Sequence, residues 1–174
     1  MSALNNKMQL NNELSFLVIC CKTNPSDDEI EFIRNTLLII DHQLLIKLAN
    51  QHGILPLVYK TLKKLLHEDP SSSHEILSNL KELYVSIAQR NMLMSAELIR
   101  IIKHLEDNVI EALAFKGPML AQMAYADITL RQYVDLDVLV KKEDIYKIDA
   151  LLKDHGYERT LEMTPTQEKV YMKN

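Results

Sequence analysis

The sequence predicts an α+β protein in which an N-terminal helical bundle is followed by a small mixed sheet with flanking helices. Only 3 Gly and 5 Pro occur among 174 residues, which favours long helices over a turn-rich all-β fold. Before residue 107, apolar residues recur every three or four positions; after it, short apolar runs are bounded by turn residues. We therefore expect a helical region over residues 1–107 and an α/β core over residues 108–174.

Three helices are expected in the first part of the chain. Ser26 can cap a helix whose first turn is acidic, and Asp41 can cap the next helix. This second helix ends near Gly53, at the position where a left-handed residue usually follows a helix. The segment Ile54-Leu55-Pro56 then opens a third helix, which is expected over Leu57–His67.

A long helix should follow the loop and cap at Pro70–Ser73. Its apolar residues recur at helical spacing over about seven turns. They are Leu80, Leu83, Tyr84, Ile87, Met94, Leu98, Ile101, Ile102 and Leu105. Asn91 interrupts this stripe. We interpret the stripe as part of the core, and the alternative is a cofactor-binding stripe that contains Met92 and Met94.

After residue 107 the pattern changes to short strands and helices. An apolar run that ends at a Gly-Pro turn predicts a strand, and a helix that stops at Gly156 is expected later. The expected elements are a strand over Val109–Phe115, a helix over Met119–Ala126, a strand over Val134–Val140, a helix over Lys142–His155, and further short strands over Tyr157–Met163 and Lys169–Met172.

Composition excludes several classes of protein. The net charge of −4 gives no global electrostatic reason to expect binding to nucleic acid. Cys20 and Cys21 are adjacent in an apolar segment, so inert thiols in a reducing compartment are expected rather than a disulfide.

No apolar run reaches the roughly 18 residues that a membrane span needs. The six histidines form no short-spaced set typical of zinc. We expect a soluble, cytoplasmic protein without a membrane partner.

The most informative pattern is the pair Asp135 and Asp137 at the start of an apolar run. Alternate side chains of a strand share a face, so the two carboxylates are expected on one side, roughly 6–7 Å apart along the chain. Two such carboxylates repel each other unless water or a cation separates them, and hard divalent cations prefer oxygen ligands. The pattern indicates a Mg²⁺ site or, alternatively, two acids at a solvated strand end.

Upstream, Lys116-Gly117-Pro118 stands between an expected strand and an expected helix. Such a turn can direct backbone N–H groups and a helix N-terminus at phosphate oxygens. Lys116 and Arg131 would each add a positive charge near a phosphate. The alternative is an ordinary strand-to-helix turn with a lysine at the surface.

Together these residues resemble the nucleotidyltransferase superfamily, the fold shared by DNA polymerase β, kanamycin-type nucleotidyltransferases and CCA-adding enzymes. More narrowly, the chain resembles a bacterial family of uncharacterised nucleotidyltransferases. The matching pieces are Ala49–Leu57, Gln89-Arg90-Asn91, Phe115-Lys116-Gly117-Pro118, Tyr125, Arg131, Asp135–Val140 and Leu152–Tyr157. Their order along the chain is more specific than any one of them.

The resemblance implies an enzyme that transfers phosphorus-containing groups. Asp135 and Asp137 would act in catalysis and hold the Mg²⁺ that bridges the oxygens of a nucleoside triphosphate such as ATP. Lys116, Gly117, Pro118 and Arg131 would bind the nucleotide. The acceptor would be a hydroxyl-bearing small molecule or macromolecule. A cation placed beforehand offsets the charge that builds up on phosphate oxygens during such a transfer.

The superfamily also supplies a third carboxylate from a later strand. The nearest candidates are Glu162 and Glu168, and neither lies in an apolar strand that would place it. We therefore expect a chain that is shortened at its C-terminus and lacks this acid. Three hypotheses remain: an active nucleotidyltransferase, a non-catalytic interaction module, and a sensor that binds nucleotide without turnover. An open sheet edge near residue 174 would allow homo-oligomers.

Overall fold

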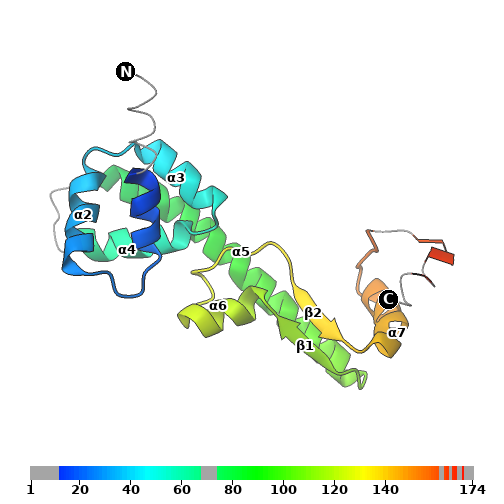
Figure 1. The fold of residues 1–174 in the computed structure, drawn as a ribbon. Helices are drawn as coiled ribbons and strands as arrows, with labels where there is room; N and C mark the ends of the chain where they lie inside the picture. The colour runs from blue at the N-terminus through cyan, green and yellow to red at the C-terminus, as the bar shows by residue number, and fades with distance from the viewer. Residues whose placement is uncertain (1–11, 68–73, 161–162, 165, 168–169, 171–174) are drawn as a thin grey trace. The chain divides into compact units, whose positions relative to one another are not determined.

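The structure, a computed structural model, describes residues 12–67, 74–160, 163–164, 166–167 and 170 (Figure 1). The chain divides into two compact units. The first comprises Met1–Ser95 and Lys116–Asp135, and the second comprises Ala96–Phe115 and Leu136–Asn174. Each unit thus combines two stretches of the chain. The single domain boundary expected near residue 107 stays a prediction.

Helices build the first unit. They are a helix over residues 12–20, α2 (Asp27–Leu37), α3 (His42–Gln51), α4 (Leu55–His67), the first part of α5 (His74–Asp107) and α6 (Gly117–Tyr125). The N-terminal helices gather around one apolar core (Figure 1). Its fully buried side chains include Phe16, Leu45, Leu55, Leu62 and Leu80. The predicted helical bundle is confirmed.

The predicted helix starts and stop are confirmed at three positions. Ser26 Oγ accepts a hydrogen bond from Glu29 N–H at 3.3 Å, and the Glu29 carboxylate accepts from Ser26 N–H at 3.0 Å. Asp41 Oδ1 accepts from the backbone N–H groups two and three residues further on, at 2.9 and 3.0 Å. These oxygens satisfy N–H groups that a first helical turn leaves unpaired. Gly53 follows α3 with φ of +67°.

The long helix predicted in the middle of the chain is α5, which has 34 residues. The cap predicted for it in the Pro70–Ser73 loop lies outside the described residues. The predicted core stripe is confirmed in part: Leu80, Ile87, Leu98 and Leu105 are buried, whereas Leu83 is 41% exposed and the other members are half-buried. Ile76 and Asn91, which lie outside the predicted stripe, are also buried, and Met92 is 60% exposed. No helix in the described part of the chain, α5 included, has the length and apolarity that crossing a membrane requires.

Two short strands form the sheet of the second unit. β1 (Ala112–Phe115) pairs with β2 (Asp137–Val140), and Phe115 lies opposite Asp137. The α+β class is confirmed. The sheet was expected to be mixed, but over the described residues it consists of one antiparallel pair. A 3-10 turn at Lys142–Asp144 and α7 (Ile145–Asp154) together replace the single helix predicted there.

Both strands are shorter than predicted. Val109 has φ of +58° and is 92% exposed, so a corner follows α5 and the strand begins only at Ala112. Residues 134–136 are irregular and precede β2. The third predicted strand is also wrong, because Tyr157–Thr160 is not a strand, and most of Lys169–Met172 lies outside the described residues. A short apolar run does not by itself distinguish a strand from a corner.

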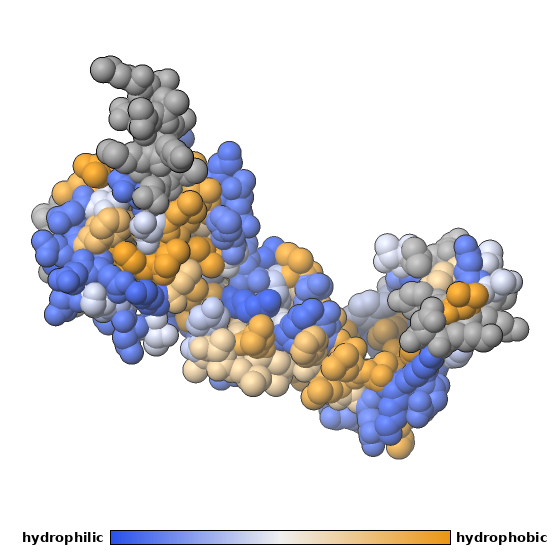
Figure 2. All heavy atoms as spheres, in the orientation of Figure 1, coloured by the Kyte–Doolittle hydropathy of each residue, from blue (hydrophilic) through white to orange (hydrophobic). Residues whose placement is uncertain are grey.

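One face of this sheet is apolar and exposed. Because side chains alternate along a strand, Leu113 and Phe115 share a face with Leu139 and Asp137. The exposed fractions of Leu113, Phe115 and Leu139 are 64%, 48% and 52%. Figure 2 shows apolar residues at the surface over β1 and β2. Asp137 therefore lies on the open face of the sheet rather than on its half-buried face.

Candidate functional site

The Lys116-Gly117-Pro118 turn joins β1 directly to α6. Lys116 is exposed, with φ of +57° and ψ of −141°, a backbone conformation that non-glycine residues rarely adopt. Gly117 has φ of +41°, and Pro118 stands in the first helical turn, where its missing N–H interrupts no intrahelical hydrogen bond. The turn therefore presents the N-terminus of α6, and the partial positive charge of a helix N-terminus favours anions.

The two aspartates lie at the start of β2, but only one of them belongs to it. Asp137 is the first residue of the strand and is half-buried, whereas Asp135 precedes it in an irregular segment and is exposed. The prediction that both project from one face of a strand is therefore wrong. Strand pairing cannot extend back to Asp135, because the partner strand ends at Phe115, opposite Asp137.

The turn and the aspartates are neighbours at the same end of β1. Phe115, the residue before Lys116, is the register partner of Asp137. A Cβ added to Gly117 would lie 3.6 Å from the backbone carbonyl oxygen of Asp135. This is ordinary contact distance, so the left-handed φ rather than lack of space favours glycine here. Gly117 thus lies near the backbone of Asp135, and Phe115 pairs with Asp137; the role of these residues in one site stays a prediction.

Asn91 fixes the segment that leads to the aspartates. Its side chain is fully buried, and its amide nitrogen donates to the carbonyl oxygens of Ile128 and Arg131, both at 2.8 Å. A buried amide that pairs with two carbonyls satisfies polar groups that would otherwise be costly to bury. The sequence showed Asn91 as an interruption of an apolar stripe, and a lone amide on such a face was the available signal for this role.

Two tyrosine hydroxyls extend this arrangement. Tyr133 OH donates to the carbonyl oxygen of Asn91 at 3.0 Å and lies 3.1 Å from Ser95 Oγ. Tyr84 OH lies 2.9 Å from Thr129 Oγ1. We call Tyr84, Asn91 and Tyr133 the loop clamp, because they hold the irregular segment between α6 and the aspartates. Sequence reasoning did not find the roles of the two tyrosines.

Arg131 lies in the segment that the loop clamp holds. Its guanidinium nitrogen Nη1 is buried and has no hydrogen-bond partner among the described residues. A buried N–H donor without an acceptor is costly, and an anionic oxygen is its best partner. Arg131 therefore fits an anion-binding role.

The segment around Gly53 also contacts this loop. Gln132 Nε2 donates to Asn50 Oδ1 at 3.2 Å. A Cβ added to Gly53 would lie 3.6 Å from the Cβ of Gln132. Three stretches far apart in sequence, around residues 50, 91 and 131, therefore meet in the first unit next to the segment that precedes Asp135.

The acid pair is the candidate metal ligand set. Among the residues that the structure describes, no group of three or more His, Cys, Asp or Glu side chains could hold a metal ion. Asp135 and Asp137 offer two carboxylates, and Mg²⁺ in nucleotide sites is usually held by one or two carboxylates plus phosphate oxygens and water. The donor set therefore fits Mg²⁺ shared with a phosphate. Glu162 and Glu168 lie outside the described residues.

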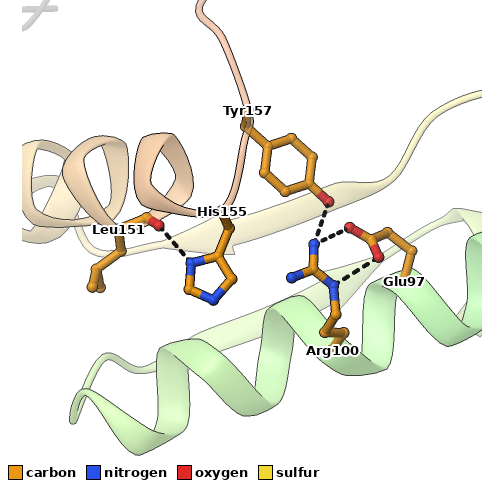
Figure 3. Close-up of polar contacts among 5 residues, drawn as sticks. All are labelled: Glu97, Arg100, Leu151, His155 and Tyr157. Atoms are coloured by element: carbon orange, nitrogen blue, oxygen red, sulfur yellow. Dashed lines mark hydrogen bonds and ion pairs between the residues drawn. The ribbon is translucent and has the colours of Figure 1, made fainter.

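A second polar cluster lies in the second unit (Figure 3). Arg100 donates from Nε and Nη2 to the carboxylate of Glu97 at 2.9 and 2.6 Å, and its Nη2 lies 3.4 Å from Tyr157 OH. Hydrogen bonding by Arg100 lowers the pKa of Glu97 below its ordinary range. The ring of His155 lies 3.9 Å from that of His104. These contacts link α5 to the segment after α7, which is a structural role.

The two cysteines carry no reactive thiolate. Burial raises the pKa of Cys20 to about 12, and burial also raises the pKa of Cys21. Because the thiolate is the nucleophilic form, thiols with raised pKa values stay protonated and inert near neutral pH. The raised pKa values favour the expected inert thiols, and the reactivity of the exposed Cys21 stays a prediction.

A strand that enters a glycine turn at a helix N-terminus and pairs with a strand that starts with an acid–x–acid pair is the pattern expected of a nucleotidyltransferase-like protein. The sequence model of a family described as uncharacterised nucleotidyltransferase matches residues 40–174, and the chain belongs to this family. The matched range contains the loop clamp, the turn and both aspartates. Neither the curated proteins nor the solved structures gave a significant match to the chain.

Proposed function

We propose that this chain is a metal-dependent nucleotidyltransferase that moves a nucleoside monophosphate from a nucleoside triphosphate to a hydroxyl acceptor. The supporting observation is the position of the Lys116-Gly117 turn next to Asp135 and Asp137 in a member of a nucleotidyltransferase family. In the reaction, the acceptor oxygen bonds to the α-phosphorus, pyrophosphate leaves with the bridging oxygen, and the hydroxyl proton passes to solvent water.

The turn and two basic residues would hold the triphosphate. Backbone N–H groups at the start of α6 can donate to phosphate oxygens, and the helix N-terminus favours their charge. Lys116 would add a compact positive charge, and Arg131 would offer its buried guanidinium nitrogen to a phosphate oxygen. These contacts would orient the nucleotide before transfer, which is a large part of catalysis in such reactions.

Asp135 and Asp137 would hold Mg²⁺ together with the phosphates. The bound ion would offset the negative charge that gathers on the phosphate oxygens during transfer. The exposed side chain of Asp135 is open to a hydrated cation, and Asp137 stands on the open face of the sheet. Asp135 is therefore accessible to a metal–nucleotide complex that arrives from solvent, and the half-buried Asp137 would be the second ligand.

A nucleotide sensor without turnover is the second candidate. The observation in its favour is that the described residues supply two carboxylates next to the turn and no group of three. A sensor would bind the metal–nucleotide complex through the same residues but would lack a carboxylate to activate the acceptor. Binding and turnover must therefore be measured separately.

Calorimetric titration with ATP, GTP, CTP and UTP, with and without Mg²⁺, tests the nucleotide site. Asp135→Asn and Asp137→Asn should each weaken Mg²⁺-dependent binding by about tenfold or more, because each removes one anionic ligand. Asp154→Asn, an exposed acid on α7, is the matched control and should bind as the wild type does. Absence of Mg²⁺-dependent binding in the wild type would favour a non-catalytic interaction module.

Release of pyrophosphate distinguishes the two nucleotide-binding candidates. A pool of acceptors that includes hydroxyl-bearing metabolites and the protein itself should support release by the transferase, and Asp137→Asn should abolish it. Binding without pyrophosphate release under any of these conditions would favour the sensor. Thermal unfolding of both aspartate variants completes the test, since a large loss of stability would mean that the acids have a structural role.

A further inference from the structure

A groove of about 800 Å³ lies in the first unit between α2, α4 and the end of α6. Sites for small molecules commonly have volumes of about 300–1,000 Å³. Charged side chains line the groove, and none of them belongs to the proposed nucleotide site. They are the cations Lys22, Arg34, Lys60 and Lys64 and the acids Asp27 and Glu31.

The charged side chains that α4 contributes to the groove are all cationic. Lys60 and Lys64 are four residues apart, so both project from the same face of the helix. α4 contains no Asp or Glu, and neither lysine has an ion-pair partner among the described residues. Like charges at this spacing disfavour a helix, so a bound anion would remove a cost to stability. By contrast, Lys22 is paired with Glu29.

α2 supplies the opposite wall, which carries acids. Asp27, Glu31 and Arg34 follow one another at helical spacing and face the groove. Carboxylates accept hydrogen bonds from hydroxyl and amino groups. The floor is apolar and suits a carbon skeleton; it is formed by Ile30, Leu57, Leu65 and Leu130. The two walls therefore differ in the chemical groups that they can bind.

The cationic wall fits a phosphomonoester better than a carboxylate. A phosphomonoester carries a charge of about −1.5 to −2 at neutral pH and has three strong acceptor oxygens, enough for two ammonium groups. The groove holds no activated nucleophile, because Cys20 and Cys21 keep their protons. The groove is thus suited to reversible binding rather than covalent capture.

We propose that this groove binds a small molecule that carries a phosphomonoester and hydroxyl groups. The phosphate lies against Lys60 and Lys64, and the hydroxyl groups face Asp27 and Glu31. In the proposed transferase this ligand is the acceptor, an assignment that rests on the proposed function. The binding site itself does not depend on that assignment.

α6 connects the groove to the proposed nucleotide site. It begins at Gly117 and ends at Tyr125, which lines the groove. Its 9 residues, at about 1.5 Å of rise each, span roughly 12 Å. An acceptor seated in the groove is therefore an extended molecule whose reactive hydroxyl lies at the end opposite its phosphate.

Titration of the full chain with glucose 6-phosphate, without Mg²⁺ or nucleotide, tests the groove. The probe should bind, and glucose, which lacks the phosphate, should not. Lys60→Glu with Lys64→Glu should weaken binding of the probe by at least about tenfold. Asp27→Asn with Glu31→Gln should weaken binding of glucose 6-phosphate but not of inorganic phosphate, because only the sugar donates to these carboxylates.

Lys47→Glu with Lys63→Glu is the matched control. Both lysines are exposed and lie outside the groove, on α3 and on α4. This variant should bind glucose 6-phosphate within about twofold of the wild type. The proposal is overturned if the wild type does not bind glucose 6-phosphate, or if the control variant loses as much binding as the Lys60→Glu, Lys64→Glu variant. It is also overturned if inorganic phosphate binds as tightly as glucose 6-phosphate.

Two further variants keep the outcome interpretable. If the glutamate variant unfolds, Lys60→Gln with Lys64→Gln replaces it, since glutamine removes the charges without reversing them. Asp135→Asn should bind glucose 6-phosphate normally, because Asp135 lies outside the groove. A result that contradicts the groove proposal therefore does not contradict the proposed nucleotide site. Likewise, a result that contradicts the nucleotide site does not contradict the groove proposal.

Discussion

Apolar burial stabilises the first unit, whereas polar contacts at the surface link the elements of the second. The core of the first unit draws side chains from five helices, from Phe16 to Ile87. In the second unit, the buried apolar side chains among the described residues are Leu98, Leu105 and Ile110, and no residue of α7 is buried. Because apolar burial is the main source of folding free energy, the first unit is expected to be the more stable one.

The contacts of the second unit are exposed. Lys147 Nζ donates to the carbonyl oxygen of Asn108 at 2.6 Å, which joins α7 to the end of α5. The ion pairs connect Arg100 to Glu97, Lys141 to Glu111, and Lys153 and Arg159 to Asp149. Exposed ion pairs contribute little, since water and salt screen them. The comparison teaches that the loop clamp belongs to a unit with a large apolar core. The sheet that carries Asp137 belongs to a unit with fewer buried apolar side chains.

The largest expected effect comes from emptying the core of the first unit. Leu62→Ala on α4 removes a side chain with 0% exposure and should lower the free energy of unfolding by about 2–5 kcal/mol. Leu139→Ala on β2 removes one that is 52% exposed and should cost about 0.5 kcal/mol or less. Urea denaturation followed by circular dichroism measures both, and equal losses would contradict the comparison.

A smaller effect is expected from the loop clamp. Asn91→Ala leaves the carbonyl oxygens of Ile128 and Arg131 without their donor and should cost about 1–3 kcal/mol. Amide hydrogen exchange over residues 128–135 should become faster, and Mg²⁺–nucleotide binding should weaken. Asn35→Ala, at an exposed site on α2, is the control. Unchanged exchange in Asn91→Ala would mean that the clamp does not hold the loop.

Two glycines with positive φ allow a matched comparison between the units. Gly117→Ala and Gly156→Ala should each lose roughly 1 kcal/mol of stability, because both impose a left-handed conformation on alanine. The added methyl group meets no atom closer than 3.6 Å at Gly117 and nothing within 4 Å at Gly156. Only Gly117→Ala should also weaken nucleotide binding in the calorimetric assay. Equal effects on binding would show that the turn has no special role.

Features set by local chemistry were predicted from the sequence. The caps at Ser26 and Asp41 and the stop at Gly53 depend on residues within a few positions, so the sequence contains the necessary information. The strand starts were not predicted, because they depend on pairing. β2 begins at Asp137 since β1 ends at Phe115, and neither run alone contains that register.

The sequence singled out the residues of the candidate site, whose roles stay predictions, but not the residues that support them. Lys116, Gly117 and Asp135 were singled out by their types and spacing, and the structure places the turn beside the acid segment. In the loop clamp, the Asn91 amide bonds to Ile128 and Arg131, which are 37 and 40 positions away in the sequence. Such pairings follow from how helices pack, and no local pattern specifies them.

The smallest expected effect is a difference in sensitivity to acid. In the second unit, the pKa values of Glu97, Glu111 and Asp149 are lowered, mainly by hydrogen bonds from Arg100, Lys141 and Arg159. In the first unit, a hydrogen bond from Lys22 lowers the pKa of Glu29. The described residues of the second unit thus hold three such carboxylates, against one in the first.

The direction of the effect follows from linkage. A carboxyl group whose pKa is lower in the folded state than in the unfolded state stabilises the fold above its unfolded pKa, and this stabilisation is lost as the pH falls through its folded pKa. The ordinary values are 4.5 for Glu and 3.8 for Asp, so the loss begins below about pH 4.5. Acid should therefore weaken the second unit more than the first.

Amide hydrogen exchange, corrected for intrinsic rates, measures this difference between α7 and α4 at pH 6 and at about pH 3.5. Protection of α7 should fall more than protection of α4, by a small margin that high salt reduces. Glu97→Gln with Asp149→Asn should remove most of the difference, because neither side chain can then gain stability by ionising. A larger loss of protection in α4 would contradict the expectation that the carboxylates with lowered pKa values make the second unit the more sensitive to acid.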